Sequence, residues 1–378
     1  MTIDSARIVI LGGGPAGLAV ARLLRLRGVW PRVLERDSGP HVVAQSGSLD
    51  LGVDGGLRAI SAIGLDEPFA AVARPQGQAF RVLDAAADVV LDLDRADFQT
   101  ARPEIDRMQL RRLLFDALPP SVVTWGARVT TVTMLPDDQY RIDVQDGQPV
   151  HADLVLACDG IGSRARPLVT DVTPAYCGVM FIQASINRPP PTSFIARNVG
   201  EGAMFALGDN KAIMGQRNAD GSIRVYFALR AVEDPRRQQG DQLADTEAER
   251  AGLRKLFDGW HPDLLAVLDQ IDGGFSYWPL YTMPTRQTWA PHQHLTLLGD
   301  AAHVMPPFTG QGVNMALIDA VDLVDALFSP ALTDIDSAIA SYEATMLERM
   351  SRAIAEANSG TDRLLCPEGP ARLLAQYR

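Results

Sequence analysis

The sequence predicts an α/β fold in which a Rossmann-like nucleotide-binding domain is interleaved with a second, antiparallel-sheet domain that is α+β in character. Three glycine-containing loops predict it. An apolar run leads into Gly12-Gly13-Gly14-Pro15-Ala16-Gly17, a second run ends at Cys158-Asp159-Gly160, and Leu298-Gly299-Asp300 opens a third loop. Since such loops at strand ends admit phosphate groups to the backbone, three of them in this order indicate one nucleotide cofactor held at three places.

Hydrophobic periodicity assigns the elements along the chain. It predicts strands at 7–11, 31–35, 153–157 and 295–298, and helices at 16–27, 107–118, 313–328 and 335–358. Short alternating runs predict antiparallel strands at 177–186, 203–207, 212–216 and 223–230. We therefore expect the nucleotide-binding domain to span 1–72, 98–174 and 274–334, the substrate domain to span 73–97 and 175–273, and 335–378 to form a C-terminal bridging helix and tail.

The first loop has the spacing of a dinucleotide-binding turn between a strand and a helix. Gly12 permits the tight turn, Gly14 admits a pyrophosphate, and Gly17 allows the helix to pack closely. Glu35 ends the second strand, where an acid binds ribose hydroxyls and disfavours a 2′-phosphate, so FAD or NAD fits better than NADP. The cofactor-binding residues predicted in this unit are Gly12, Gly14, Ala16, Gly17, Glu35 and Arg36.

Composition narrows the class of protein. The chain has 378 residues and a formal net charge of -11, which argues against nucleic acid or an anionic membrane surface as a partner. Its 3 cysteines are too few and too far apart for a disulfide framework or a zinc site. The N-terminal residues have no signal-peptide pattern, and we expect a cytoplasmic monomer.

The three loops together resemble the fingerprints of the flavoprotein aromatic hydroxylases, the single-component monooxygenases similar to p-hydroxybenzoate hydroxylase. The matches are Gly12 to Gly17, Asp159-Gly160 with Ser163 and Arg166, and Gly299-Asp300. The resemblance implies FAD as cofactor, NADPH or NADH as reductant, and oxygen transfer through a flavin C4a-hydroperoxide rather than a side-chain triad. It also implies that Asp300 holds a ribityl hydroxyl, that Asp159 supports binding of FAD and the pyridine nucleotide, and that Arg107 reaches the flavin.

A closer resemblance is to the TetX-type tetracycline-inactivating monooxygenases. It rests on Ser46-Gly47-Ser48-Leu49-Asp50-Leu51, Glu104-Ile105-Asp106-Arg107, Phe181-Ile182-Gln183-Ala184 and the stretch from Met305 to Asn314. By this resemblance Asp50 contacts the flavin and Gln183 faces the substrate. The loop residues implied to line the flavin are Pro307, Phe308, Gly310, Gln311, Gly312, Val313 and Asn314.

The sequence also departs from the TetX pattern. The tetracycline-contacting arginine and histidine of that family fall near Gly202 and on Arg224, and an arginine for the pyridine nucleotide falls on Val43. The substrate residues predicted here are Gln183, Met214, Arg224 and Phe308. Arg217 and Arg224 are open to two interpretations, an anion site or a solvated strand edge, and His303 is open to a catalytic or a packing role.

The function predicted from these features is hydroxylation of a polycyclic aromatic or enolised polyketide, with a tetracycline as the leading small-molecule substrate. Two alternatives stay open: a biosynthetic hydroxylase acting on another phenolic substrate, and a non-catalytic FAD-binding protein. A flavin halogenase is disfavoured because no Trp-x-Trp-x-Ile motif is present. A two-domain pyridine-nucleotide reductase is disfavoured because the chain has no second GxGxxG with a redox cysteine pair.

Overall fold

A five-stranded parallel sheet forms one end of the molecule. The structure is a computed structural model that describes residues 3–40, 42, 47–234, 241–243 and 247–376. The strand order is β18-β11-β1-β2-β7, and all neighbours run parallel. The bounds are β1 Ile8–Leu11, β2 Arg32–Leu34, β7 Val123–Thr124, β11 Leu154–Ala157 and β18 Leu295–Leu297. The predicted βαβ unit is present, with α1 (Pro15–Leu26) between β1 and β2.

An eight-stranded sheet forms the other end, in the order β16-β17-β12-β15-β14-β13-β4-β5. Its neighbours are antiparallel except for β13 and β4. The bounds are β4 Phe80–Asp84, β5 Val89–Leu93, β12 Ala175–Ile186, β13 Ala203–Gly208, β14 Lys211–Arg217, β15 Ile223–Arg230, β16 Asp241–Leu243 and β17 Phe275–Thr282. The strands expected from alternation are therefore confirmed, most of them with one or two further residues at an end.

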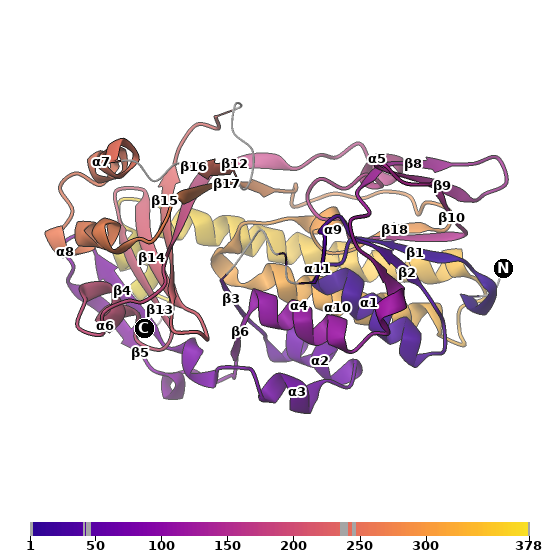
Figure 1. Cartoon of the computed structure of the whole chain (residues 1–378), viewed down its shortest axis with the longest axis horizontal. Coiled ribbons are helices and arrows are strands. Elements are labelled where there is room, and N and C mark those ends of the chain that lie inside the picture. Colours follow the sequence, from indigo (N-terminus) through magenta and orange to yellow (C-terminus); the bar gives the residue numbers. More distant parts are fainter. Residues whose placement is uncertain (1–2, 41, 43–46, 235–240, 244–246, 377–378) are drawn as a thin grey trace.

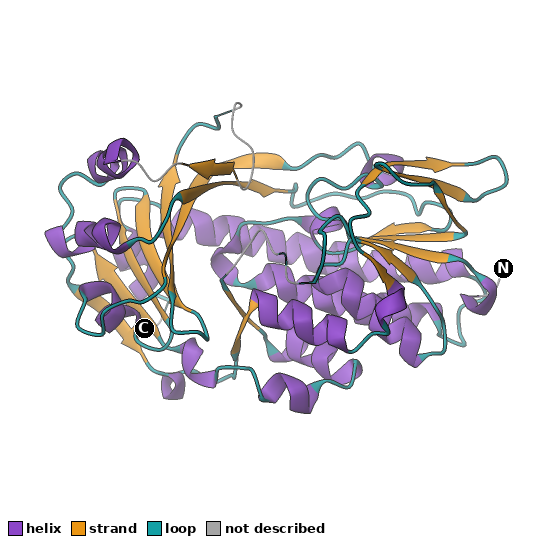
Figure 2. Cartoon of the chain, viewed as in Figure 1, coloured by secondary structure: helices purple, strands orange, loops and turns teal. Residues whose placement is uncertain are grey.

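Helices fill the space beside and between the two sheets (Figures 1 and 2). α10 (Gln311–Leu327) packs against α1 on one side and against α11 (Ile335–Leu364) on the other. α11 has 30 residues, or about 45 Å at 1.5 Å per residue, and runs from the parallel sheet towards the eight-stranded sheet. It continues past the predicted end at Asn358, because its apolar positions persist to Leu364. No described helix has the length and apolar character needed to cross a bilayer.

Smaller elements connect and cover these layers. A two-stranded ribbon, β3 and β6, lies between the two sheets, and a three-stranded sheet of β8, β9 and β10 lies beside the parallel sheet. Their bounds are β3 Ser48–Asp50, β6 Glu104–Asp106, β8 Val129–Met134, β9 Tyr140–Val144 and β10 Val150–Ala152. The helices are α2 Arg58–Ala62, α3 Asp66–Ala70, α4 Arg107–Asp116, α5 Arg166–Val169, α6 Phe194–Val199, α7 Glu247–Leu256, α8 Pro262–Leu265, α9 Asp300–His303 and α12 Gly369–Leu374.

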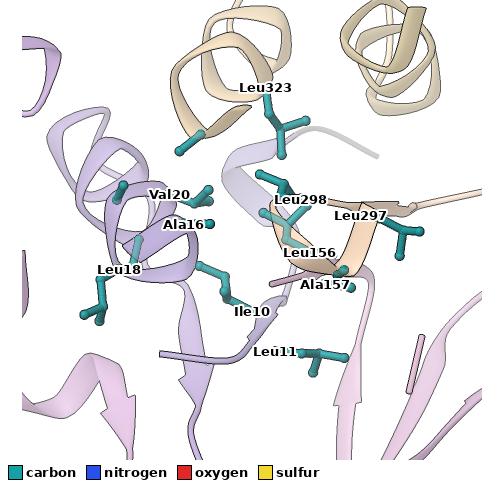
Figure 3. Packing of buried hydrophobic residues seen from close by; sticks show 14 of the residues in the cluster. Ile10, Leu11, Ala16, Leu18, Val20, Leu156, Ala157, Leu297, Leu298 and Leu323 are labelled. Carbon is teal, nitrogen blue, oxygen red and sulfur yellow. The ribbon is translucent and has the colours of Figure 1, made fainter. Parts of the chain in front are cut away.

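The cores explain this arrangement. The nucleotide-binding core contains Ile10, Leu156, Leu298 and Leu323, which lie between α1, α10 and the ends of β1 and β11, while Leu18 points to the other side of α1 (Figure 3). The eight-stranded sheet is apolar on both faces. Along β15, Val225 and Phe227 join one cluster while Tyr226 and Ala228 join another. Because side chains alternate along a strand, one face packs against α6 and α8, and the other faces Phe308 and the end of α11.

Candidate functional site

The three predicted loops meet at the carboxyl ends of β1, β11 and β18. A Cβ at Gly12 would lie 2.3 Å from the carbonyl oxygen of Cys158, and a Cβ at Gly17 would lie 2.0 Å from that of Gly12. A Cβ at Gly299 would lie 3.6 Å from that of Ala16 at the start of α1. The first loop is therefore in contact with both other loops. The contact with the second loop requires Gly12, and packing within the first loop requires Gly17, whereas the contact between Gly299 and Ala16 is at an ordinary van der Waals distance.

The carboxylate of Glu35 is hydrogen-bonded to the first loop. Its Oε2 accepts a hydrogen bond of 2.5 Å from the Gly13 N–H, and its Oε1 accepts one of 2.8 Å from the Asp37 N–H. Arg111 of α4 lies 3.7 Å from the same carboxylate and donates to the Gly13 carbonyl at 3.1 Å. Arg36, beside Glu35, is exposed. These contacts fix the carboxylate of Glu35, the predicted ribose-binding residue, against the loop that would also bind the cofactor.

Arg166 joins the second and third loops. Its Nε donates to the Ala301 carbonyl at 2.7 Å, and its Nη2 donates to the Asp300 carbonyl at 3.1 Å. Asp159 Oδ2 accepts from the Arg164 N–H at 2.7 Å, but Asp159 Oδ1 is buried with no partner among the described residues. Burial raises the pKa of Asp159, while Ser163, Arg164 and Arg166 oppose the shift. Asp159 therefore retains one oxygen for a ligand.

The backbone and the side chain of Asp300 differ in their contacts. The residue is exposed, and no hydrogen bond or ion pair joins its carboxylate to the part of the chain that the structure describes. His303, three residues on, is buried and lies 2.6 Å from Asp319 of α10, measured from Nε2 to Oδ2. Burial alone would lower the pKa of His303, but the Asp319 carboxylate, with a smaller contribution from Asp300, raises it. Sequence reasoning missed Asp319, although an acid on the apolar face of a helix was a usable signal.

The loop predicted to line a flavin begins with a 3-10 turn at Pro307–Thr309 and continues into α10. A Cβ at Gly310 would lie 2.4 Å from Oδ1 of Asp50, so this loop is in contact with the ribbon strand β3. Asp50 is also paired with Arg102 at 2.6 Å. Pro307 is exposed, and Phe308, Gln311, Gly312 and Val313 are half-buried at the start of α10.

Asn314 uses its whole side-chain amide inside the protein. Its Oδ1 accepts from the Gly52 and Gly56 N–H groups at 2.8 Å, and its Nδ2 donates to the Asp50 and Gly310 carbonyls at 2.8 Å. The side chain therefore ties two loops together. Any contact that Asn314 makes with a cofactor has to come from its backbone.

The ribbon of β3 and β6 carries a half-buried acid that sequence reasoning did not single out. Glu104 accepts from the Ser48 hydroxyl and, at 3.3 Å, from Gln216 Nε2 of β14. Gln216 Oε1 accepts from the Ser48 N–H at 3.2 Å, which links the ribbon to the eight-stranded sheet. Burial raises the pKa of Glu104 to about 7, and the Asp50 carboxylate adds to the shift, while Ser48, Arg74 and Arg102 oppose it.

The predicted substrate residues occupy one face of the eight-stranded sheet. Gln183, Tyr226 and Met214 are cross-strand neighbours on β12, β15 and β14. Two residues along β12, Phe181 packs edge-on against Phe308 with ring centroids 5.5 Å apart. The structure thus brings Gln183, Met214 and Phe308 to the same side, and Phe308 joins them to the flavin-lining loop.

Two arginine side chains on this side have no hydrogen-bond or ion-pair partner among the described residues. No hydrogen bond or ion pair joins the side chain of Arg107 or of Arg224 to any residue in the described ranges, and Arg224 Nε is buried. Burial lowers the pKa of both, and both interact electrostatically with Tyr226. Arg107 also interacts with Asp300. Arg217 differs, because its guanidinium donates to the carbonyls of Gly200, Gly221 and Ala196.

The departures from the TetX pattern also have structural positions. A Cβ at Gly202 would lie 1.9 Å from the Ala79 carbonyl oxygen, so no side chain fits where that family carries a substrate contact. Arg224 lies on the sheet face that carries Gln183 and Met214. Val43, and Ser46 of the first TetX-like stretch, lie outside the described residues.

The residues present fit FAD. A Cβ at Gly14 meets no atom within 4 Å, so the loop at the start of α1 leaves open space for a pyrophosphate. Beyond it, Asp159 Oδ1, the Asp300 carboxylate and the Arg107 guanidinium lack protein partners in the described part of the chain. These are acceptors for ribityl or nucleotide hydroxyls and a donor for a flavin carbonyl.

Comparison with known proteins agrees with this fit. A family model described as an FAD binding domain matches residues 5–357. The 3-amino-4-hydroxybenzoate 2-monooxygenase of Streptomyces cremeus is 30% identical over 370 residues, which cover 96% of this chain and 89% of that protein. Two solved structures share the fold. A salicylate hydroxylase substrate complex has a TM-score of 0.78 at 20% identity, covering 98% of this chain and 93% of that one. Tetracycline destructase Tet(55) has a TM-score of 0.76 at 20% identity, covering 100% and 97%.

Proposed function

The chain belongs to the FAD binding domain family of aromatic monooxygenases, and we propose that it uses NADPH or NADH to hydroxylate an acidic phenol or enolised aromatic. The observation that carries the substrate class is Arg224, whose side chain has no hydrogen-bond or ion-pair partner among the described residues and lies on the sheet face of Phe181, Tyr226 and Phe308. A buried guanidinium without an acceptor is unfavourable, and an anionic substrate group supplies that acceptor.

The residues that would hold FAD follow from the three loops. The Gly12–Gly17 turn and the start of α1 would bind the pyrophosphate, and Glu35 the adenosine ribose. Asp300 would accept from the ribityl chain, with Asp159 beside it. Asp50, Arg107 and the loop residues Pro307, Gly310, Gln311, Gly312 and Val313 would surround the ring system. When bound and reduced, FAD supplies the activation of molecular oxygen.

The chain's own part in the reaction is to bind, orient and desolvate the substrate. Arg224 would pair with the anionic group, which fixes one end of the ring. Burial raises the pKa of Tyr226, although Arg224 and Arg107 oppose the shift, so its hydroxyl stays protonated and can donate a hydrogen bond. Gln183 has no side-chain partner among the described residues and would orient a substrate hydroxyl. Phe181 and Phe308 would keep water away from the reacting carbon.

Two substrate classes compete within this proposal. The TetX-like stretches around Asp50 and Gln183 favour a tetracycline. Arg224 favours an acidic phenol, as does the substrate after which the 30% identical relative is named, 3-amino-4-hydroxybenzoate. We favour the acidic phenol, because the tetracycline destructase is 20% identical and its likeness extends to the fold alone, and because Gly202 leaves no room for a side chain there.

The test is a substrate panel with the FAD-loaded protein. The protein is incubated in air with NADPH or NADH and, separately, with 3-amino-4-hydroxybenzoate, salicylate or tetracycline, and each product is examined by mass spectrometry. We expect an acidic phenol to stimulate reductant consumption and to gain one oxygen. Oxygen addition to tetracycline but to neither acidic phenol would contradict the proposed substrate class and favour a tetracycline. Bound FAD without stimulation by any compound would favour the non-catalytic alternative. We also propose that the protein is a cytoplasmic monomer, and light scattering measures its oligomeric state.

A further inference from the structure

Asp319 of α10 is a wholly buried carboxylate that contacts the third loop at Gly299 and at His303. Its Oδ2 accepts from the Gly299 N–H at 3.0 Å and lies 2.6 Å from His303 Nε2. Its Oδ1 accepts from Arg349 Nη2 of α11 at 2.7 Å. The side chain has 0% exposure, so each of these contacts is made without competition from water.

Burying this charge has a cost that the three donors offset. Burial acts to raise the pKa of Asp319, but His303 and Arg349 outweigh it and the net shift is downward, so the carboxylate is ionised. A buried ion pair rarely stabilises a fold more than apolar packing of the same size would. Asp319 is also outside the set of residues that would touch FAD or substrate. Its geometry therefore calls for an explanation other than stability or direct contact.

The explanation lies in how the turn from Gly299 to His303 is held. Arg166 donates to the carbonyls of Asp300 and Ala301, and Gln287 Nε2 donates to the Ala302 carbonyl at 3.1 Å. Asp319 holds the Gly299 N–H at the start of the turn and His303 at its end. The backbone is thus fixed from several sides, while the Asp300 carboxylate is exposed and unpaired in the described chain.

We propose that Asp319, together with His303, is a positioning residue that presets the orientation of Asp300 towards the ribityl chain of FAD. The inference rests on the proposed FAD site. A carboxylate acceptor presented by a fixed turn loses little conformational entropy on binding, whereas the same carboxylate on a loose turn has to be ordered by the cofactor. The expected consequence of releasing the turn is weaker FAD binding.

The experiment measures FAD affinity of the apoprotein by quenching of flavin fluorescence, so it does not depend on turnover. Asp319→Asn removes the charge that binds His303 and is expected to weaken FAD binding by at least about tenfold. Asp322→Asn is the matched control, because Asp322 lies on the same helix and pairs with the same Arg349 at 2.5 Å but does not contact the turn. The control is expected to bind FAD within about twofold of the wild type.

A double-mutant cycle separates positioning from a general structural effect. If Asp319 acts through Asp300, then Asp319→Asn costs much less affinity in an Asp300→Ala background than in the wild type. Equal losses in both backgrounds would overturn the inference, as would an Asp319→Asn variant that binds FAD like its control. Asp300→Ala alone tests the site itself, since unchanged affinity there would remove the FAD assignment on which the inference rests.

A second pair of variants covers the case in which Asp319→Asn does not fold. His303→Leu removes the donor to Asp319, and His303→Gln keeps an N–H donor on a side chain of similar reach. We expect His303→Leu to weaken FAD binding about tenfold and His303→Gln to recover most of it. Equal affinities for the two variants would contradict the inference, because a role in packing alone does not require the donor.

Discussion

Gly12 lies so close to Cys158 that a Cβ at position 12 would come 2.3 Å from the Cys158 carbonyl oxygen. Gly12 also has a φ of +94°, a conformation that L side chains rarely adopt. This contact brings the end of β1 against the end of β11, so the first and second loops form one surface. The glycine therefore serves packing between loops as much as access for a pyrophosphate.

Gly12→Ala should cost both stability and FAD content. The left-handed backbone costs about 1 to 2 kcal/mol, and the shift needed to clear Cys158 adds about 1 to 3 kcal/mol. Gly28→Ala is the control, because Gly28 has a φ of +85° but no atom within 4 Å of a Cβ. Urea unfolding of both apoproteins, with flavin content of the purified holoproteins, checks this. Equal losses in the two variants would show that the contact with Cys158 does not matter.

Glu104→Gln should change how stability depends on pH. Burial is the main reason that the pKa of Glu104 is raised to about 7, against 4.5 for an ordinary glutamate. The folded state therefore binds this proton more tightly than the unfolded chain, so Glu104 stabilises the fold fully below about pH 4.5 and loses that contribution as pH rises through 7. Between pH 5 and pH 8 the wild type should lose roughly 2 kcal/mol relative to Glu104→Gln.

The measurement is the free energy of unfolding of the apoprotein in urea at several pH values across that range. Taking the difference between the two proteins cancels the titration of all other groups that behave alike in both. Glu67→Gln, at an exposed position on α3, is the control and should parallel the wild type. A Glu104→Gln curve that also parallels the wild type would mean that Glu104 is ionised in the fold at pH 5.

The sequence was sufficient for the parts of the fold that depend on local pattern. Apolar runs and alternation predicted β1, β2, β11 and β18 of the parallel sheet but not β7. They also predicted the four strands β12 to β15 of the eight-stranded sheet. They missed the three-stranded sheet of β8, β9 and β10. β8 and β10 have few buried positions and so a weak alternation signal, whereas Tyr140, Ile142 and Val144 of β9 do alternate with polar residues.

Long-range side-chain networks could not be predicted in the same way. Ser48 and Glu104 meet because β3 pairs with β6, and Gln216 joins them because that ribbon lies against the eight-stranded sheet; nothing local to any of them indicates the other two. His303 illustrates the same limit. Its motif was visible, but its partner Asp319 is 16 residues away on another helix. Arg217 and Arg224 looked equivalent in the sequence, and the structure separates them by whether backbone carbonyls occupy the guanidinium.

Arg224→Gln should weaken binding of an acidic substrate and leave FAD binding unchanged. A charged hydrogen bond in a partly desolvated site contributes about 1.5 to 3 kcal/mol, so we expect KM for the acidic phenol to rise about 10- to 100-fold. A carboxamide analogue of the same phenol should show little change, because it has no anion for the guanidinium to pair with. Arg197→Gln, at an exposed position on α6, controls for loss of one positive charge. A rise in KM of equal size for the acid and the amide would contradict the anion-binding role.

Gln183→Ala should separate reductant consumption from product formation. Gln183 is 7% exposed, lies beside Tyr226 on β15, and has no side-chain partner among the described residues, so its amide is available to a substrate hydroxyl. Without that hydrogen bond the substrate still binds through Arg224, but the ring is free to rotate away from the reacting geometry. We expect NADPH or NADH oxidation to continue while hydroxylated product falls several-fold and hydrogen peroxide accumulates. Ile182→Val is the control, because Ile182 is the neighbouring residue of β12 and packs into the cluster on the opposite face. Wild-type coupling in Gln183→Ala, measured as product formed per reductant consumed, would return Gln183 to a structural role in the sheet.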